Sequence, residues 1–478
     1  MFLRGLAVLG CGLLRFRSAS SHKRPWCGGI DFRSWSAFTA MSATASPMTL
    51  NAETRAQLRE EKRIVALRIR AKQCAHFLRN QEMSEYLLNM RKKPNIVDDP
   101  CAEKDARGKP LTKLLQLNAD IEAQDVSQLP PIVRGLCAHA DPPVEVVQHK
   151  VLVEYNDMSY SQVLRRLLPD DVEVPRSFEE VGHLAHVQLR EAQLPYRHLI
   201  GQVLLDKLRH IRVVVHKTAS IASEFRVFPM EVLAKDPSLK EDECTQVTLH
   251  EYGAEFTFDF ARVYWNSRLH EEHHRLVESF DDNTGLIVDL MAGVGPFAVP
   301  AAKKGIEVYA NDKNPDSAKW LLHNVERNHV EDRVHCSNEC ARECWRRLRR
   351  QGVRPAHVIM NLPASAIDFC DVFHGTYADD DREYSQDDMP LVHVYCFARG
   401  ESKVEQQADV QERIARTLGV SVDCTARWVR NVAPYKDMYC ATFRLPLAVA
   451  RGESAKPENL LCDSERERQR LLERRNDH

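Results

Sequence analysis

The chain has 478 residues, of which 44% are hydrophobic and 28% are charged, and its formal net charge is −2. This composition is typical of a soluble globular protein, and it argues against an intrinsically disordered chain and against an integral membrane protein. The length predicts about two or three domains. Because the net charge is small, any binding to polyanions must come from local basic surface.

The first 40 residues predict a mitochondrial targeting presequence. They carry six Arg and Lys side chains, one acid, and interleaved serines and apolar residues, as mitochondrial transit peptides do. The alternative is a secretory signal with residues 5–14 as its apolar core, but two arginines follow that core closely. We therefore expect the mitochondrial matrix as the main compartment. A shorter form that starts at Met41 or Met48 would supply a nuclear and cytoplasmic pool.

The 14 cysteines are spread over the whole chain and include no CxxC pair. A structural zinc ribbon is therefore not expected, and the thiols are predicted to be reduced. Cys336, Cys340 and Cys344 recur at helical spacing, which predicts that they share one side of a helix.

Two regions predict smaller α+β domains. In residues 51–149, the stretch RIVALRIRAKQCAHFL has apolar residues at helical spacing and predicts helices with charged faces. Residues 91–140 are rich in Pro, Asp and Lys and predict loops. In residues 150–280, helical patterns alternate with stretches such as VGHLAHVQL and VTLHEYGAEFTFDF, which predict strands.

The third region, residues 281–450, predicts an α/β fold. Residues 285–330 have the pattern of a buried strand, a glycine-containing turn, a helix, a second strand that ends in an acid, and another helix. Such a βαβ unit indicates a parallel sheet, which HVIMNLP and LVHVYCF extend. ARWVRNV and MYCATFRLP predict an antiparallel strand pair that closes the sheet. The acidic run at residues 376–388 and the charged tail at residues 451–478 are expected to be solvated.

The segment DLMAGVGPF, which begins at Asp289, predicts a cofactor site where a strand meets a helix. Gly293 and Gly295 allow the backbone to approach a ligand closely. A dinucleotide is disfavoured, because Phe297 and the alanine after it replace the third glycine of G-x-G-x-x-G. Asp312 ends the second strand, where a carboxylate accepts hydrogen bonds from ribose hydroxyls. These features favour S-adenosylmethionine, and the alternative is a purely structural glycine turn.

Asn361 and Pro363 follow the strand HVIM and are therefore expected at the same edge of the sheet. An Asn amide at this position offers two donors and an acceptor to the edge of a planar base. Pro363 would fix the loop. The alternative is a simple Asn-initiated turn, but the position at the predicted cofactor edge favours a role in binding.

These segments together resemble the tRNA guanosine-37 N1-methyltransferases of archaea and eukaryotes. The similarity runs from about residue 151 to about residue 446 through VGHLAHVQLREAQLPYRHLIGQVLLDK, FRVFPMEVL, VYWNSRLHEEHHRL, DLMAGVGPFAVPAAKK, ANDKNP, NLPASAI and VRNVAPYKDMYCATF. The resemblance implies a Rossmann-like class I methyltransferase sheet with a C-terminal antiparallel strand pair. It also implies S-adenosylmethionine-dependent methylation of N1 of guanosine 37, which protects the reading frame.

The resemblance also implies the partners. Residues 51–149 would contact the outer corner of tRNA, and the anticodon loop would enter the active site. The enzyme would act as a monomer, without a membrane span and without a metal in its chemistry.

The resemblance assigns roles to individual residues. In VYWNSRLHEEH the residue that corresponds to the general base of the family is Glu272. Arg226 occupies the position of the arginine that stabilises negative charge on guanine O6, and Asn361 would hold the N1/N2 edge of the base. Tyr264 and Pro363 are expected to contact the substrate. The expected cofactor-binding residues are Arg268, His273, Asp289, Ala292, Gly293, Val294, Gly295, Pro296, Phe297, Asp312 and Asn361.

A different interpretation starts from His270, Glu271 and His274, which satisfy the H-E-x-x-H pattern of zinc metallopeptidases. It needs Glu271 as the base, and the two histidines and a third residue as zinc ligands. No downstream partner is apparent, and the cofactor motif follows at once. We therefore regard this five-residue pattern as accidental.

Two positions depart from the family pattern. Ser267 stands where the family usually has Pro, and Cys340 replaces an Asp expected to bind the adenine amino group, which predicts weaker cofactor binding. The alternatives are an enzyme that transfers the aminocarboxypropyl group of the same cofactor to modified guanosine 37, and a tRNA-binding protein impaired in catalysis. Intact Arg226, Glu272 and Asn361 argue against the second alternative.

Overall fold

The structure of this protein is a computed structural model that describes residues 50–218, 225, 227–281, 283–433 and 435–454. The predicted presequence lies outside the described residues, as do Arg226 and all but the first four residues of the predicted tail. Among the described helices, none has the length and apolar composition needed to cross a bilayer.

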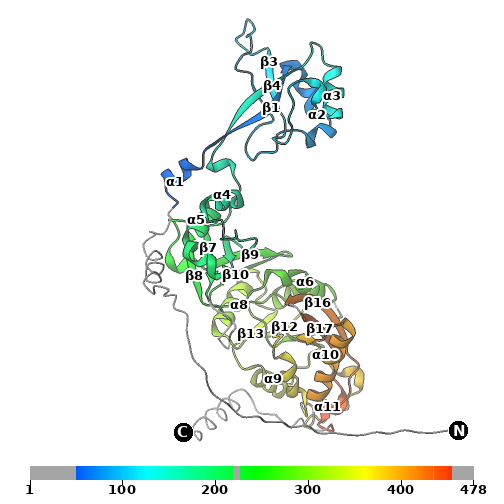
Figure 1. The fold of residues 1–478 in the computed structure, drawn as a ribbon. Helices are drawn as coiled ribbons and strands as arrows, with labels where there is room; N and C mark the ends of the chain where they lie inside the picture. The colour runs from blue at the N-terminus through cyan, green and yellow to red at the C-terminus, as the bar shows by residue number, and fades with distance from the viewer. Residues whose placement is uncertain (1–49, 219–224, 226, 282, 434, 455–478) are drawn as a thin grey trace, which may run out of the picture. The chain divides into compact units, whose positions relative to one another are not determined.

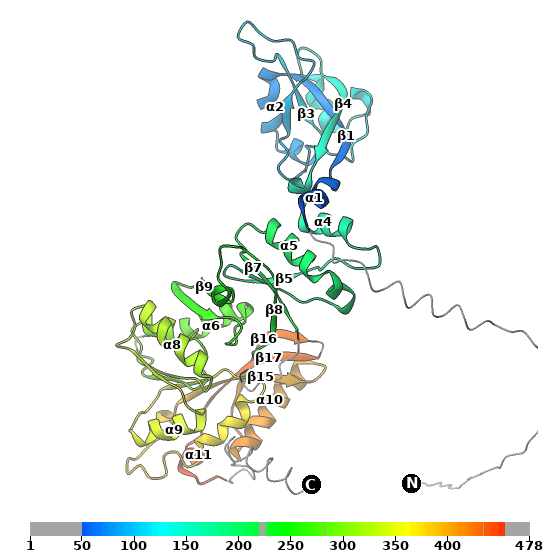
Figure 2. The ribbon, with the colours of Figure 1, turned by 90° about the vertical axis from the view of Figure 1, so that its left-hand side faces the viewer.

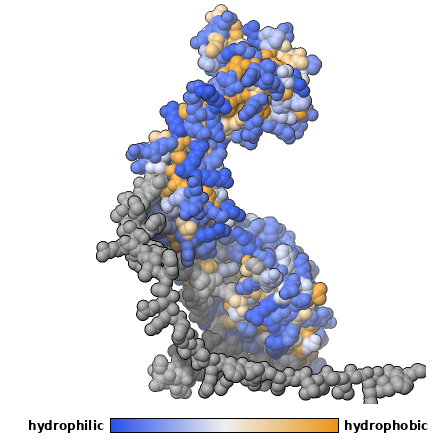
Figure 3. All heavy atoms as spheres, viewed as in Figure 1, coloured by the Kyte–Doolittle hydropathy of each residue, from blue (hydrophilic) through white to orange (hydrophobic). Residues whose placement is uncertain are grey.

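A four-stranded antiparallel sheet organises the N-terminal part, with its strands in the order β2-β3-β1-β4. The elements are α1 (Ala52–Gln57), β1 (Glu60–Arg70), α2 (Cys74–Arg79), β2 (Ile96–Asp98), β3 (Thr112–Gln116), α3 (Pro131–Ala138) and β4 (Glu145–Val153). Phe77 of α2 and Val133 of α3 are buried in one core with side chains of β1 and β3. On the face drawn in Figure 3, the surface of this N-terminal part is mostly hydrophilic, with small apolar areas.

The expectation of helices across RIVALRIRAKQCAHFL is wrong for its first half, which belongs to β1. Val65, Leu67 and Ile69 lie on one face of this strand, while Ile64 is buried in a separate cluster. A short run buried on both faces shows no strict alternation, so its period cannot distinguish a strand from a helix. The β-branched residues favour the strand, which pairs with β3 and β4. The stretch expected to form loops contains β2, β3 and α3.

The middle part combines a mixed four-stranded sheet, in the order β5-β6-β7-β8, with a hairpin of β9 and β10. The elements are α4 (Tyr160–Leu167), β5 (Phe178–Val181), β6 (Leu184–Val187), α5 (Arg197–Lys207), β7 (Val213–Lys217), β8 (Met230–Lys235), β9 (Gln246–Glu251) and β10 (Ala254–Asp259). Helix α5 approaches β8 closely because Gly201 lacks a side chain; a Cβ there would lie 2.5 Å from Cβ of Leu233. The strands predicted in this region are confirmed.

The C-terminal part is built on a seven-stranded sheet in the order β13-β12-β11-β14-β15-β17-β16. The first five strands in this order are parallel, while β17 is antiparallel to β15 and to β16. The strands are β11 (Ile287–Asp289), β12 (Val308–Asn311), β13 (Val334–Ser337), β14 (His357–Met360), β15 (Leu391–Arg399), β16 (Thr425–Ala433) and β17 (Lys436–Arg444). This is the predicted α/β sheet with its C-terminal antiparallel pair (Figures 1 and 2).

Both faces of this sheet are buried. The accompanying helices are α6 (His270–Glu278), α7 (Ala298–Lys303), α8 (Pro315–Arg327), α9 (Ala341–Arg350), α10 (Lys403–Leu418) and α11 (Leu447–Arg451). Ile287 and Ile359 belong to one apolar cluster, and Val288 and Val358 belong to a second. Neighbouring residues of each strand thus enter opposite cores, as expected for parallel strands covered on both faces.

Asn324 of α8 and Asn328, the C-cap of this helix, fix the β9–β10 hairpin to this part of the chain. Asn324 is fully buried, accepts a hydrogen bond from the amide of Thr257 (2.8 Å) and donates one to the carbonyl of Val294 (3.0 Å). One turn later, Asn328 accepts from the amide of Glu255 (2.9 Å) and donates to its carbonyl (2.7 Å). Asn324 therefore joins the hairpin to the glycine loop, which contains Val294.

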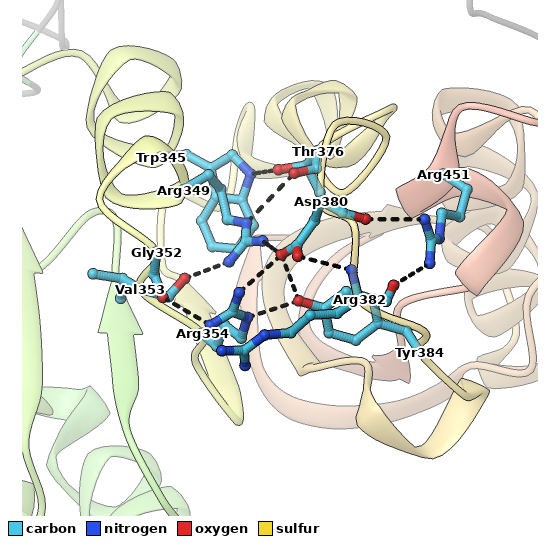
Figure 4. Close-up of polar contacts among 10 residues, drawn as sticks. All are labelled: Trp345, Arg349, Gly352, Val353, Arg354, Thr376, Asp380, Arg382, Tyr384 and Arg451. Atoms are coloured by element: carbon cyan, nitrogen blue, oxygen red, sulfur yellow. Dashed lines mark hydrogen bonds and ion pairs between the residues drawn. The ribbon is translucent and has the colours of Figure 1, made fainter.

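The acidic run at residues 376–388 is exposed along most of its length, but Asp380 is an exception (Figure 4). Its carboxylate accepts hydrogen bonds from Tyr384 (2.5 Å) and Arg354 (2.9 Å), and Arg349 lies 3.5 Å away. These hydrogen bonds, first the one from Tyr384, hold the pKa of Asp380 well below its ordinary value. Since Arg349 belongs to α9, the loop is fastened to that helix.

The expectation that Cys336, Cys340 and Cys344 lie on one side of a helix is wrong, because the three cysteines do not belong to one helix. Cys336 lies in β13, Cys340 is the N-cap of α9, and Cys344 lies inside α9. The spacing of four crosses the end of a strand, so the periodicity is accidental. The cysteines in the described part of the chain are free thiols.

We expect Asn324→Leu to lower the free energy of unfolding by about 2–4 kcal/mol, because it leaves the buried Thr257 amide and Val294 carbonyl without partners. Denaturation in urea measures the change. The matched control is Asn283→Leu at an exposed position, which should change stability by less than about 0.5 kcal/mol. An Asn324→Leu variant as stable as the wild type would contradict the linking role of this side chain.

Candidate active site

The glycine loop after β11 borders open space at the carboxyl edge of the sheet. Gly293 (φ 56°) and Gly295 (φ 99°) both have left-handed backbone conformations. A Cβ on Gly295 would lie 2.9 Å from the side chain of Leu321, so this glycine allows α8 to pack against the loop. A Cβ on Gly293 would meet nothing within 4 Å. A ligand can therefore approach the backbone at Gly293, at the edge where open α/β sheets bind ligands.

Asp312 follows β12 and fastens the glycine loop to that strand. One carboxylate oxygen accepts a hydrogen bond from the amide of Gly293 and the other accepts one from the amide of Asn314, both at 2.8 Å. Desolvation raises the pKa of Asp312 above its ordinary value. The amide of Ala292 donates to the carbonyl of Asn311, the last residue of β12 (2.8 Å). The predicted ribose-binding carboxylate thus lies directly beside the predicted cofactor loop.

Asp289, the last residue of β11, is fully buried. One of its carboxylate oxygens accepts a hydrogen bond from the amide of Met291 (3.2 Å), and the other has no partner. Burial, together with the nearby charge of Asp312, raises the pKa of Asp289 to about 8. A buried oxygen without a donor is rare in folded proteins and is a place where a ligand can bind.

Asn361 directly follows β14, and its side-chain oxygen is also buried without a partner. Pro363 is buried, and its carbonyl accepts a hydrogen bond from the amide of Phe397 in β15 (3.0 Å). This bond holds the loop on the neighbouring strand. Asp289 and Asn361 therefore present two buried oxygens without partners from the ends of two adjacent strands, which fits a ligand with hydrogen-bonding groups.

Glu272 lies in the first turn of α6 and is 6% exposed. Arg275, one turn later, donates two hydrogen bonds to its carboxylate (2.9 and 2.6 Å). Tyr395 of β15 donates a third (3.1 Å), and Arg427 of β16 donates a fourth. The hydrogen bonds to Glu272 raise the pKa of Arg275. Sequence reasoning missed these three partners. The i, i+3 spacing on a helix could have indicated Arg275, but no motif points to Tyr395 or Arg427.

Phe297 connects Glu272 with the glycine loop. Its buried ring lies 5.6 Å from the ring of Tyr395 and 4.8 Å from that of His273, measured between centroids. His273 is buried as well, and its Nδ1 lies 3.8 Å from a carboxylate oxygen of Glu251. The structure therefore brings the predicted residues Glu272, His273 and Phe297 together.

Tyr264 and Arg268 lie at the surface, in the segment before α6. Tyr264 is 38% exposed, and its hydroxyl accepts a hydrogen bond from Asn266 (3.4 Å). Arg268 is exposed within the 3₁₀ helix Ser267–Leu269. The remaining predicted loop residues, Val294 and Pro296, are buried and half-buried. The place of Arg226, outside the described residues, stays a prediction, and so do the roles of all these residues.

The residues of the H-E-x-x-H pattern pack on the protein surface. The rings of His270 and His274 are stacked on Tyr252, with centroid distances of 6.2 and 3.7 Å. Nδ1 of His270 lies 2.6 Å from the carbonyl oxygen of Ser267, and the side chain of Glu271 is 76% exposed. In the part of the chain that the structure describes, no group of three or more His, Cys, Asp and Glu side chains is arranged to hold a metal ion.

Known families and proteins match most of the chain. Residues 247–423 match the TRM5/TYW2 methyltransferase domain, and residues 160–235 match the TYW2 N-terminal domain. A tRNA (guanine(37)-N(1))-methyltransferase of Phytophthora infestans is 38% identical over 391 residues, which cover 81% of this chain and 90% of the relative. The enzyme of that name from Danio rerio is 42% identical over 316 residues, which cover 64% of each protein.

Solved structures match in fold. Trm5b from Pyrococcus abyssi aligns with a TM-score of 0.54 at 23% identity and covers 80% of this chain and 99% of its own. The chain in the complex of aTrm5 with tRNALeu aligns with a TM-score of 0.55 at 22% identity over the same shares. These similarities confirm the predicted fold class.

We expect Asp289→Asn to flatten the pH dependence of stability in the absence of ligand. The folded pKa of about 8 exceeds the ordinary value of 3.8, so the native state holds this proton more tightly than the unfolded state does. This contribution is complete below about pH 4 and is lost as the pH rises through about 8. Between these limits, the ionisation of Asp289 lowers the free energy of unfolding of the wild type by up to about 1.4 kcal/mol per pH unit, and the substitution removes this contribution.

Urea denaturation at several pH values from about 5 to about 8 measures this slope. Asp379→Asn, which removes an exposed carboxylate, should keep the slope of the wild type. If the free energy of unfolding of Asp289→Asn declines with pH as steeply as that of the wild type, Asp289 does not hold the proton.

Proposed function

The chain belongs to the tRNA (guanine(37)-N(1))-methyltransferases, and we propose how its site methylates N1 of guanosine at position 37 of tRNA. The buried carboxylate of Glu272, which Tyr395 and Phe297 join to the glycine loop, carries this proposal. We further propose S-adenosylmethionine as the methyl donor. Residues 51–149 are proposed to contact the outer corner of tRNA.

S-adenosylmethionine fits the carboxyl edge of the sheet. Gly293 leaves room beside the backbone, and Asp289 and Asn361 each present a buried oxygen without a partner. The amino groups and ribose hydroxyls of this cofactor can donate hydrogen bonds to such oxygens. Asp312 is proposed to bind the ribose hydroxyls, as a carboxylate after the second strand does in comparable folds. When bound, the cofactor supplies an electrophilic methyl group on a positively charged sulfur.

Glu272 is proposed as the general base. N1 of guanine bears a proton at neutral pH and is a poor nucleophile until that proton leaves. A carboxylate within hydrogen-bond distance can accept the proton, and negative charge then develops on O6. Arg226 is proposed to stabilise this charge, because a guanidinium group can bind the oxygen directly.

The target base must reach this carboxylate. Position 37 lies in the anticodon loop, so its base has to leave the stack to enter the site. Asn361 is proposed to hold the N1/N2 edge of the base with its amide, and Pro363 fixes the Asn361 loop through its bond to Phe397. The exposed ring of Tyr264 is proposed to stack on the base.

We expect Glu272→Gln to reduce the rate of N1-methylguanosine formation by about 10²- to 10⁴-fold, because the amide cannot accept the N1 proton. The assay uses S-adenosylmethionine and paired tRNA transcripts with guanosine or adenosine at position 37, and mass spectrometry identifies the product. The matched control is Glu271→Gln, one residue earlier on the same helix but exposed, which should stay within about twofold of the wild type.

Three outcomes would contradict the assignment. A Glu272→Gln variant as active as the wild type would show that another group takes the proton and would exclude Glu272 as the base. Loss of methyl transfer in Glu271→Gln, with Glu272→Gln still active, would assign the role of base to Glu271, the glutamate of the H-E-x-x-H pattern. A product that carries an aminocarboxypropyl group in place of a methyl group would contradict the proposed reaction.

We expect Cys340→Asp to tighten S-adenosylmethionine binding by about three- to tenfold, the value of one added hydrogen bond. Cys340 is the N-cap of α9 and makes no side-chain cap bond. The residue before it, Glu339, donates its amide to Asn311 at the end of β12 (3.0 Å), so Cys340 lies close to the cofactor edge. A carboxylate there can accept a hydrogen bond from the adenine amino group.

An Asp at this position also caps α9, which alone stabilises the fold by about 1 kcal/mol. Cys340→Ser is therefore the control, since it caps the helix without adding a carboxylate. Calorimetric titration of the cofactor into all three proteins measures the dissociation constants. Equal constants for the wild type and Cys340→Asp would show that Cys340 does not weaken adenine binding.

A further inference from the structure

The carboxylate of Glu272 has no acceptor position left. A carboxylate offers about four lone-pair positions, two on each oxygen. Oε1 accepts hydrogen bonds from Arg275 Nη2 (2.6 Å) and Tyr395 OH (3.1 Å). Oε2 accepts from Arg275 Nε (2.9 Å) and from Arg427 Nη1. A further donor such as guanine N1–H can bind only if one of these donors leaves.

Arg427 is the donor that can leave at the smallest cost. Tyr395 is 1% exposed and stands on β15 inside the sheet. Arg275 makes two parallel bonds from the same helix, and its side chain is 34% exposed. Arg427 makes a single bond, and its side chain is 47% exposed. When this bond breaks, water can solvate the half-exposed guanidinium group, and the buried carboxylate keeps its hydrogen bonds from Arg275 and Tyr395.

The strand that carries Arg427 is suited to an RNA backbone. Among the described strands, β16 pairs only with β17, so its other edge is open. Arg430 follows on the same strand and donates to Asn266 (3.3 Å), which in turn donates to the hydroxyl of Tyr264 (3.4 Å). Trp428 is 40% exposed. Guanidinium groups bind phosphates in a bidentate manner, and exposed aromatic rings stack on unpaired bases.

We propose that Arg427 is an exchangeable partner of Glu272. In the free enzyme it occupies one acceptor position of Oε2; when tRNA binds, it moves to a phosphate of the RNA backbone and frees that position. The N1–H bond of guanine then breaks, its electron pair stays on N1, and the proton forms an O–H bond with Oε2 of Glu272. Arg275 and Tyr395 keep the carboxylate in place during this step. This inference rests on the proposed function, which supplies the base and the guanine.

The proposed exchange predicts that Arg427→Ala weakens tRNA binding but leaves the rate of methyl transfer at saturating tRNA almost unchanged. We expect the variant to bind tRNA about three- to tenfold more weakly and to lower the magnitude of the salt slope of binding by about 1, since one phosphate contact is lost. The single-turnover rate of methyl transfer at saturating tRNA should stay within about twofold of the wild type, because the acceptor position of Oε2 that Arg427 fills is empty in both proteins once tRNA is bound.

Two variants complete the design. Arg427→Lys keeps the charge and should retain the salt slope of the wild type. Arg416→Ala is the matched control; it removes an exposed arginine of α10 that pairs with Glu412 (2.5 Å), and it should change neither quantity. Thermal unfolding of each variant checks that the fold is intact.

Two results would overturn the proposal. In the first, Arg427→Ala binds tRNA like the wild type but transfers the methyl group more than about tenfold more slowly at saturating tRNA, as a fixed holder of the base would require. In the second, neither affinity, salt slope nor rate changes. Failure of the proposed function is distinguishable, because the wild type itself would then form no N1-methylguanosine.

Discussion

The buried charge of Glu272 is the constraint on which the catalytic part of this protein depends. A carboxylate that loses its water is tolerated only where donors replace it. Glu272 takes its donors from its own helix, from β15 and from β16, so these three elements must meet at one point. The antiparallel end of the sheet makes this meeting feasible. Helix α10 carries the chain from β15 to the edge strand β16, which holds Arg427, and β17 then returns antiparallel between these two strands.

The β9–β10 hairpin links Glu272, the proposed base, to the glycine loop. Glu251 at the end of β9 faces His273, the residue after Glu272. Thr257 on β10 is bonded to Asn324, which also holds the carbonyl of Val294 in the glycine loop. The two hydrogen bonds of Asn324 are short and buried, and the Glu251–His273 pair is largely buried, so a displacement of the hairpin would move both α6 and the loop. The two halves of the site are thereby held in a fixed relation by side chains that have no role in the chemistry.

The sequence predicted those parts of the site whose signals are local. The glycine turn, Asp312 and Asn361 each follow directly from a strand end, and the structure places them at one edge. Two partners of Glu272 could not be predicted, because Tyr395 and Arg427 lie 123 and 155 residues away and carry no motif. Strand β1 was missed for a different reason. Its apolar residues are buried on both faces, and its pairing with β3 and β4 decides the conformation.

The two halves of the proposed site differ in what they need from a ligand. On the cofactor side, Asp289 and Asn361 keep buried oxygens without donors, each at a cost of about 1–3 kcal/mol that a bound donor removes. On the base side, Glu272 has its acceptor positions filled, so a donor must leave before guanine can bind there. The cofactor can therefore bind without displacing any donor of the protein, whereas the RNA must displace one. The phosphates of the same RNA can hold the displaced guanidinium group of Arg427. Correct docking of the tRNA and the release of an acceptor position on Glu272 are therefore coupled.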